Sequence, residues 1–442
     1  MPMLYTSEVR THSTKGSFVM VVARVLGGAL LVAALLFAGL LFAFHRHFQP
    51  AAPQSDYPAP KSALEAQRQD LDYFTKVMAL DRAFSPAARA AAATRLHELS
   101  TLTEALPSQK LQVALMQVMA LADNGHSRVD PTADGSSLVL PVQVTRFAEG
   151  FYVMRASSGY SDLVGGRVDS IDGQAIDPIL TRLETLRGGV EGFRRQNAAQ
   201  FMGVQDLLYG LGIAAKPNAS TWTVTKPDGQ VVTRQLDAAP LQQGPRSDAD
   251  HFRLYPTGRC AEVVRLPSIS DVEGQQITPF LASTEKALRA HPPCSIIVDL
   301  RGNGGGDYTN TWHFAHALPQ LTTGPISILT DPATFSAAIT TAAFIKEAGG
   351  SRVALIGEPV GDRLSFFSEG GRACLPNLKV CVHYQTGKHD YGQACNSWRE
   401  CFWLNWLYPV RVDTLQPDTL VQFTFADRNA GIDRALVTAA DR

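Results

Sequence analysis

The chain has 442 residues, of which 45% are hydrophobic, and its formal net charge at pH 7 is -1. This length exceeds one ordinary domain, so two or three domains with full apolar cores are expected. The near-neutral charge and the lack of a basic tract exclude nucleic acid as a favoured partner, because that binding needs cationic side chains to displace counterions.

The first feature along the chain is an uncharged apolar run, residues 25–44. Its twenty residues match the thickness of a bilayer's hydrocarbon core. Arg10, Lys15 and Arg24 precede it, so the positive-inside rule places residues 1–24 in the cytoplasm. We therefore expect a single-pass protein of the inner (cytoplasmic) membrane, with its body in the periplasm or outside. A cleaved signal peptide is the alternative, but no small-x-small site follows the run.

All six cysteines lie beyond this run, which suggests disulfides formed in an oxidising compartment. Metal binding is the alternative, but the spacings fit no zinc pattern, and neither a metal nor a cofactor is expected. Fifteen pairings are possible in principle. The first prediction joins near neighbours in the sequence: Cys374 with Cys381, Cys395 with Cys401, and, as the remainder, Cys260 with Cys294.

The next segments differ in composition. Residues 45–61 contain four prolines and are predicted to be a stiff tether. Residues 62–136 show apolar positions at helical spacing, and Pro86 and Pro107 divide them into about three helices. This pattern predicts a helical packing subdomain.

Residues 137–240 have short alternating strands with glycine turns, and helices are expected over 179–186 and 198–211. The block GGRVDSIDGQAIDPILTRL (165–183) resembles the second half of a PDZ domain. That resemblance implies a PDZ-like α+β insert, in which a bound peptide would add a strand at an exposed edge. A purely structural role is the alternative.

Residues 241–442 alternate between strands and helices, which predicts an α/β core with a mainly parallel sheet. After Gly370 the chain returns to short strands. Strands are expected over 296–300, 326–330 and 353–356, with helices over 275–291, 312–318 and 337–347. An aromatic cluster near the end, expected in the core or in a covering lid, comprises Trp398, Phe402, Trp403 and Trp406.

Two neighbouring strand ends of this core carry the candidate chemistry. The first strand runs into the glycine turn 302–306, and the second leads to Ser336 at a helix start. The N–H groups of the glycine turn and of Ala337 would stabilise an oxyanion beside a serine hydroxyl. The alternatives are an ordinary N-cap serine and a phosphate-binding turn, but the turn lacks both the P-loop ending and the dinucleotide spacing.

A serine nucleophile needs a base. Lys346 would lie about 15 Å along the helix from Ser336, too far to take its proton. His126 follows a helix end in the polar turn 123–127, and catalytic groups are assembled in space rather than along the chain. His313 and His316 are competing imidazoles whose spacing also suits a metal. We expect them on a partly buried helix face.

Several motifs together resemble the tail-specific, or C-terminal-processing, serine peptidases. They are IIVDLRGNGGGD (296–307), TFSAA (334–338), ALIGEPVGD (354–362), LQPD (415–418) and DxxxGxD (427–433). The resemblance covers residues 62–442. It implies a crotonase-like peptidase core, a nucleophile at Ser336, oxyanion donors at Gly305 and Ala337, and cleavage near the C-termini of exported proteins.

The resemblance also bears on the base. Where one branch of the family has a lysine, this chain has Asp362. A second branch, with an upstream D-x-G-H-T-like motif and a downstream G-E-P-T-G-G segment, is closer. It implies His126 as the base and Glu369 as the acid that orients it, with Glu358 as the second choice. The chain departs from that branch at Ser127, Val360 and Asp362.

Together these features predict a membrane-anchored, extracytoplasmic serine peptidase that acts on peptides or unfolded protein C-termini. Two alternatives remain. The first is an inactive protein that keeps the fold and binds peptides or an envelope partner. The second is an acyl-CoA enzyme of crotonase type, which export and the cysteine pairs disfavour because thioesters are cytosolic.

Overall fold

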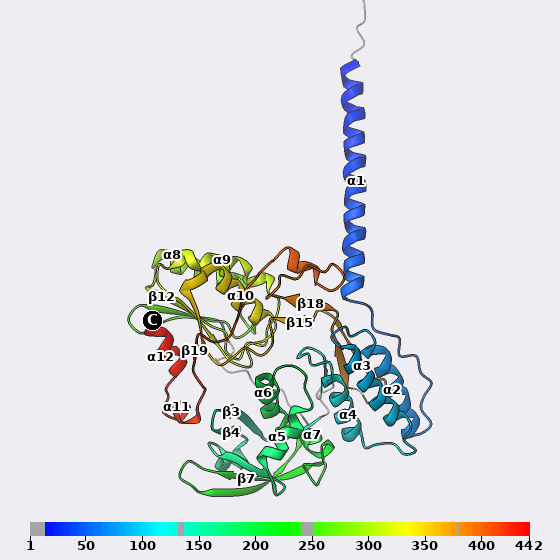
Figure 1. The fold of residues 1–442 in the computed structure, drawn as a ribbon, viewed down its shortest axis with the longest axis vertical. Coiled ribbons are helices and arrows are strands. Elements are labelled where there is room, and N and C mark those ends of the chain that lie inside the picture. Colours follow the sequence, from blue (N-terminus) through cyan, green and yellow to red (C-terminus); the bar gives the residue numbers. More distant parts are fainter. Residues whose placement is uncertain (1–13, 131–136, 241–250, 379) are drawn as a thin grey trace, which may run out of the picture. The chain divides into compact units, whose positions relative to one another are not determined.

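The computed structural model describes residues 14–130, 137–240, 251–378 and 380–442. The chain divides between Pro50 and Ala51 into two compact units, which are described separately. The first contains α1 (Thr14–Phe48), the long blue helix of Figure 1. Its segment Leu26–Phe48 is long and apolar enough to cross a membrane. The expected apolar helix is therefore present, and by length and composition it fits a membrane anchor or a signal sequence.

The second unit begins with three helices, as predicted. Ser62 and Ser85 are N-caps whose side chains accept backbone N–H groups of the first turn. Pro86 opens the second helix, where a missing N–H group costs nothing. The helices are α2 (Ala63–Met78), α3 (Pro86–Ser100) and α4 (Ser108–Ala120).

The segment before α2 packs on that helix, although it was predicted to be a tether. Tyr73 Oη donates a hydrogen bond to Pro53 O at 2.8 Å. Gln69 Nε2 donates to Pro58 O at 2.9 Å. The segment therefore runs antiparallel to α2, and its earlier residues lie beside the C-terminal half of the helix.

An antiparallel sheet follows, in the strand order β3-β4-β5-β7-β8 with β6 paired to β5, together with a separate pair of strands, β2 and β9, three α-helices and one 3-10 helix. The helix expected over 198–211 is two short helices, because Val204 is extended and forms a bridge with Val139. The strands are β2 (Leu138–Val139), β3 (Val142–Phe147), β4 (Gly150–Ala156), β5 (Arg167–Ile171), β6 (Gln174–Ala175), β7 (Ala219–Thr225), β8 (Val231–Asp237) and β9 (Ala239–Pro240), and the helices are η1 (Ser158–Leu163), α5 (Ile176–Glu184), α6 (Glu191–Phe201) and α7 (Gln205–Gly210).

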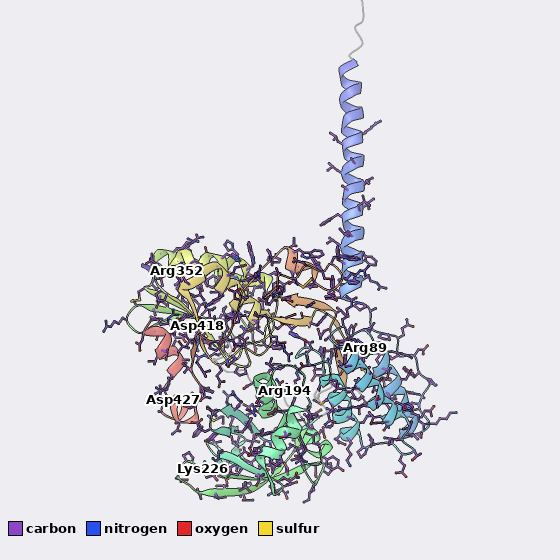
Figure 2. The ribbon with its side chains drawn as sticks, viewed as in Figure 1. Arg89, Arg194, Lys226, Arg352, Asp418 and Asp427 are labelled. Carbon is purple, nitrogen blue, oxygen red and sulfur yellow. A yellow bond between two sulfur atoms is a disulfide. The ribbon has the colours of Figure 1, made fainter. Side chains whose placement is uncertain are left out.

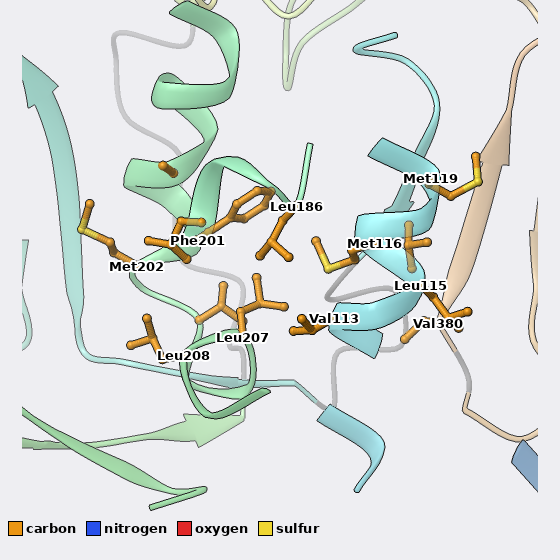
Figure 3. Packing of buried hydrophobic residues seen from close by; sticks show 14 of the residues in the cluster. Val113, Leu115, Met116, Met119, Leu186, Phe201, Met202, Leu207, Leu208 and Val380 are labelled. Carbon is orange, nitrogen blue, oxygen red and sulfur yellow. The ribbon is translucent and has the colours of Figure 1, made fainter. Parts of the chain in front are cut away.

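One hydrophobic core joins the helical segment to this sheet. Figure 3 shows Met116 of α4 facing Leu186 and Leu207, with Val380 from the C-terminal part on the other side of α4. Strand β1 (Arg128–Asp130) also pairs with β17 (Cys381–Tyr384), which pairs with β16 (Gly371–Cys374). The expected boundaries at 136/137 and 240/241 adjoin residues 131–136 and 241–250, which lie outside the described residues.

The remaining residues form a second sheet with the order β10-β11-β12-β13-β14-β19. From β11 to β19 the pairs are parallel, as predicted, and β10 is antiparallel. The strands are β10 (Arg253–Thr257), β11 (Ala261–Arg265), β12 (Ser295–Asp299), β13 (Ile326–Thr330), β14 (Val353–Gly357) and β19 (Thr419–Leu420), and the larger helices are α8 (Ile277–Ala290), α9 (Thr309–Leu321), α10 (Ala337–Gly349) and α12 (Arg434–Ala440).

This second sheet is covered on both faces. Ile296, Val298 and Ile328 point toward the core that includes α8, α9 and α10. Ile297 and Leu329, one position along, pack against α12. Because successive side chains of a strand point to opposite faces, strands buried on both sides are continuously apolar, as in SIIVD and ISILT.

Three disulfides close the fold with the predicted pairing. Cys260–Cys294 joins the starts of β11 and β12. Cys374–Cys381 joins β16 to β17, and Cys395–Cys401 closes a loop after β18 (Gly387–Asp390). The smaller remaining elements are β15 (Ser365–Ser368), paired with β18, and η3 (Gly350–Arg352), η4 (Trp403–Trp406) and α11 (Phe425–Asn429).

Candidate active site

The site begins where β12 and β13 end side by side, with Asp299 paired to Leu329. Asn303, which is fully buried, holds the glycine turn that follows β12. Its Nδ2 donates to Leu266 O at 2.8 Å, and its Oδ1 accepts the Gly305 N–H at 2.9 Å. The backbone carbonyl of Asn303 accepts the Phe335 N–H at 2.9 Å. One buried asparagine therefore fixes the glycine turn against the loop that carries the candidate nucleophile.

Ser336 is held in a strained backbone conformation. It is the N-cap of α10, with φ 55° and ψ -126°, and its side chain makes no capping hydrogen bond. For a residue with a Cβ this conformation costs on the order of 1–3 kcal/mol. Ser336 is partly buried, and a strained backbone at a sharp strand-to-helix turn is also found at other serine nucleophiles.

Strain is concentrated in the candidate motifs. Among the described residues, five non-glycine positions have positive φ, and Asp123, Ser336 and Glu369 are three of them. Such conformations persist where the surrounding structure enforces them, which is common at functional sites. The backbone thus marks the same three segments as the sequence motifs.

Gly305 lies directly against Ser336. A Cβ placed on Gly305 would be 2.6 Å from Ser336 Cβ and 2.9 Å from Ala337 N. The glycine turn and the start of α10 therefore enclose the space beside the hydroxyl. The Gly305 N–H points to Asn303 Oδ1 in this conformation, so it is not directed at an oxyanion position.

Gly305→Ala is expected to lower the rate of labelling by a fluorophosphonate by roughly 10²-fold or more, the effect of losing one oxyanion donor. The added methyl group would displace Ser336 or the Ala337 N–H. Gly304→Ala is the matched control, since no atom lies within 4 Å of a Cβ placed there. Equal labelling rates for the two variants would contradict the predicted role of Gly305.

His126 is buried between aromatic rings. Its ring centroid lies 4.3 Å from that of Phe335 and 5.2 Å from that of Phe366. Neither ring nitrogen has a hydrogen-bond partner among the described residues. The structure therefore brings His126 to the residue next to Ser336 but shows no hydrogen bond between the two side chains.

The surroundings keep His126 neutral. Burial holds the pKa of His126 well below its usual value, and the positive charges of His389, Arg128 and Arg187 act in the same direction. Neutral imidazole is the form that accepts a proton from a nucleophile.

The carboxylate next to His126 is Asp362. Its Oδ2 lies 3.9 Å from His126 Nδ1 and has no hydrogen bond, while its Oδ1 accepts the Arg363 N–H at 2.8 Å. Burial raises the pKa of Asp362 to about 7. The sequence analysis noted Asp362 only as a residue that stands where relatives have a lysine, and it did not predict the contact with His126. An ionisable residue directly after the GEPVG segment was the feature of the sequence that could have indicated it.

Glu369 lies beside a different histidine. Its Oε1 is 3.6 Å from His389 Nε2, and β15 pairs with β18 so that Phe366 is opposite His389. The His389 Nδ1 lies 3.2 Å from the Tyr391 hydroxyl, which is hydrogen-bonded to Thr340 at 2.6 Å. This buried network reaches α10 one turn after Ser336. Sequence reasoning missed His389, which stands within an ordinary strand.

Glu358, the second-choice acid, is held elsewhere. It forms a two-point ion pair with Arg146 of β3, at 2.9 and 3.3 Å. Both side chains are largely buried. Glu358 therefore connects the two sheets and does not orient His126.

Arg146→Ala is expected to lower the free energy of unfolding by about 3–5 kcal/mol, because the Glu358 carboxylate would stay buried without its partner. Adding Glu358→Gln should recover part of that loss. Denaturant unfolding of the single and double variants measures both effects. A loss below about 1 kcal/mol for the single variant, typical of an exposed pair, would contradict this assignment.

The other candidate bases lie away from the site. The His313 side chain is 83% exposed, 3.6 Å from Glu285, and His316 Nδ1 bonds to Trp312 O at 2.7 Å. Lys346 Nζ is 3.1 Å from Asp418, labelled in Figure 2, at the far end of α10. No group of three or more potential ligands for a metal occurs in the described part of the chain.

A cleft of about 970 Å³ runs beside β3, an edge strand of its sheet. Arg128, Asp130 and Arg187 line it together with β3 and α6. The Arg187 guanidinium lies 5.4 Å from the centre of the Phe193 ring, which stacks on Phe335 at 4.3 Å. Two aromatic rings therefore connect this cleft to the loop of Ser336.

Comparison with solved structures finds proteins of similar fold. The chain is similar to the structure of mature CPAF complexed with lactacystin, with 13% identity, a TM-score of 0.59 and coverage of 86% of this chain and 98% of the other. The fold of the chain is that of CPAF. A second structure of mature CPAF gives 13% identity, a TM-score of 0.56 and coverage of 83% and 94%.

The photosystem II D1 C-terminal processing protease is a more distant match, with 14% identity, a TM-score of 0.39 and coverage of 80% and 93%. No protein-family model and no curated protein matches the chain. The likeness to CPAF is a likeness of the mixed α/β fold at low identity, and it assigns no catalytic residue.

Proposed function

We propose that the protein is a tail-specific serine peptidase anchored by α1, with its body in an extracytoplasmic compartment. The proposal rests mainly on the position of Ser336, which has a positive φ and lies at the start of α10 beside the glycine turn. Acyl transfer needs a nucleophile beside backbone N–H donors, and this arrangement brings Ser336 next to the backbone of Gly305 and Ala337. The motifs that resemble this peptidase family fall on these same elements.

In the proposed reaction, Ser336 Oγ attacks the peptide carbonyl carbon and its proton passes to His126 Nε2. The N–H groups of Ala337 and Gly305 stabilise the oxyanion. Collapse breaks the C–N bond, and the leaving amine takes the proton from His126. A water molecule then gives His126 a proton and hydrolyses the acyl-enzyme, which restores Ser336.

This route requires two local changes from the conformation described. The His126 imidazole must turn toward Ser336, since its nitrogens now make no hydrogen bond. The Gly305 N–H must leave Asn303 Oδ1 to serve as a donor. Substrate binding is the event that we expect to cause both, because catalytic hydrogen bonds often tighten only in the substrate complex.

Two carboxylates are candidates for orienting His126. The family resemblance implies Glu369, whereas Asp362 is the one within 3.9 Å of His126 Nδ1. We assign the orienting role to Asp362. Glu369 then interacts with His389 and, through it, with the hydrogen-bonded network of Tyr391 and Thr340.

The substrate is proposed to be a peptide or an unfolded protein C-terminus. The edge strand β3 and its cleft support this, since an extended peptide can add a strand there. This sheet is the PDZ-like part of the proposal, and the parallel sheet is its crotonase-like core. The three disulfides support an oxidising compartment.

The test is digestion of a proteome-derived peptide library by the purified full chain, with mass spectrometry of the products. New termini that disappear in Ser336→Ala support the peptidase. The second candidate is a non-catalytic peptide-binding protein, favoured by the absence of a His126–Ser336 hydrogen bond among the described contacts. Retention of peptides without new termini would establish that alternative.

A further inference from the structure

The segment that follows α1 reaches the second unit beside the C-terminal half of α2. The segment after α1 packs on the second unit from Ala52 onward, and Tyr73 Oη donates a hydrogen bond to Pro53 O. Tyr73 lies in the C-terminal half of α2, and Pro58 lies farther back along the same helix. The chain therefore arrives at the C-terminal end of α2.

The tryptophan loop, residues 395–407, lies at this same end. Arg82, which follows α2, donates from its Nη1 to Arg399 O at 3.2 Å. Its backbone N–H also donates to Gln385 O at 2.7 Å, just before β18. The entry point of the chain and the tryptophan loop are thus joined through the residues that follow α2.

The tryptophan loop presents apolar side chains to solvent. Trp398 is 61% exposed, Leu407 is 61% exposed and Trp406 is 42% exposed. The Arg399 guanidinium lies 5.0 Å from the centre of the Trp398 ring, so a cation accompanies the aromatic surface.

The loop is also fixed in place and cannot readily bury these side chains. The Cys395–Cys401 disulfide closes it. Lys388 of β18 accepts hydrogen bonds on its carbonyl from Phe402 N and Asn405 Nδ2, and donates its N–H to Glu400 O. A rigid loop with exposed tryptophans favours a partner that covers it.

We propose that the tryptophan loop rests in the headgroup region of the bilayer that holds α1. This rests on the proposed anchoring. One helical turn after Phe44 adds about 6 Å, and the five residue steps from Phe48 to Pro53 add at most ~18 Å. The length of this connection therefore limits the distance from the hydrocarbon to Pro53 to about 24 Å, as estimated from these rises per residue.

Lipid fits this surface better than another protein. Tryptophan is enriched at the membrane interface, where its ring meets acyl chains and its N–H meets water. Arg399 beside Trp398 would face the phosphates.

The test uses the full chain in vesicles of phosphatidylcholine with brominated acyl chains, which quench nearby tryptophans. The chain has five tryptophans and none lies in α1, so any quenching arises from the second unit. We expect clear quenching in the wild type and loss of more than half of it in Trp398→Phe/Trp406→Phe. Trp222→Phe, at a fully buried position, is the control and should keep it.

Three further measurements separate the outcomes. Release of the wild type from vesicles by alkaline carbonate would overturn the anchoring, whereas retention without quenching would overturn the lipid contact alone. Emission that changes with the protein-to-lipid ratio but not with bromination would assign the loop to a second copy and also overturn the proposal. Fluorophosphonate labelling in the same vesicles reports the peptidase function independently.

Discussion

Ser336→Ala is expected to abolish covalent labelling by a fluorophosphonate and to lower peptide cleavage by about 10⁶-fold, since removal of a serine nucleophile disables its base as well. The fold should persist. Alanine keeps the Cβ, and the Ser336 side chain makes no capping hydrogen bond that alanine would lose. Relief of the strained backbone is not expected, because alanine meets the same steric limits as serine.

The measurement is gel-based labelling of the purified full chain, with circular dichroism as the check on folding. Ser270→Ala is the matched control, since Ser270 lies beside Gly306 in the same turn region but outside α10. Labelling that survives in Ser336→Ala and fails in Ser270→Ala would overturn the assignment of the nucleophile.

Asp362→Asn is expected to lower kcat/KM by roughly 10²–10⁴-fold, the usual contribution of general-base catalysis. The pKa of Asp362 is raised to about 7 by burial, and that of His126 is well below 6.5. Wild-type activity should therefore rise as pH passes through about 7, when Asp362 ionises opposite His126 Nδ1. In Asp362→Asn this rise should vanish.

The raised pKa of Asp362 also predicts how this residue's contribution to stability changes with pH. Folding raises the pKa of Asp362 from 3.8 to about 7, so the folded chain binds this proton more tightly than the unfolded chain. Asp362 therefore makes its largest contribution to the free energy of unfolding below about pH 4. That contribution falls as pH rises to about 7, by at most ~4 kcal/mol. Asp362→Asn should remove that slope from the unfolding free energy.

Glu369→Gln separates the two candidate acids. If Asp362 orients His126, Glu369→Gln keeps the rise in activity near pH 7 and changes only its height. If the rise persists in Asp362→Asn and disappears in Glu369→Gln, the role belongs to Glu369, as the family resemblance implies. The pH profiles of kcat/KM for both variants decide between them.

Much of the fold follows from local patterns. Continuous apolar runs predicted β12, β13 and β14 to within a residue or two, because a strand buried on both faces needs apolar side chains at every position. Pro86 and Pro107 predicted the division into α2, α3 and α4, because proline stands at the start of α3 and directly before α4. Near neighbours in the sequence predicted two of the three disulfides, and the third followed as the remainder.

The surroundings of His126 did not follow from local patterns. Asp362 and His126 are separated by more than two hundred residues, and their approach depends on how the chain after β14 returns to the helical segment. Arg363 shows this contact directly, since its Nη1 donates to Asp123 O at 3.0 Å. A motif indicates which residue types are present but not which carboxylate meets which imidazole.

The sequence by itself determined strand β12, the glycine turn after it and the place of Ser336 at the start of a helix. Each of these depends on neighbours within a few residues and on the side-chain pattern of one element. Only the tertiary structure decided that His126 meets Asp362, that Glu369 meets His389, and that the segment before α2 packs on that helix. Those contacts join distant parts of the chain. Their geometry is set by the pairing of β15 with β18 and by the packing of α2, which no local pattern specifies.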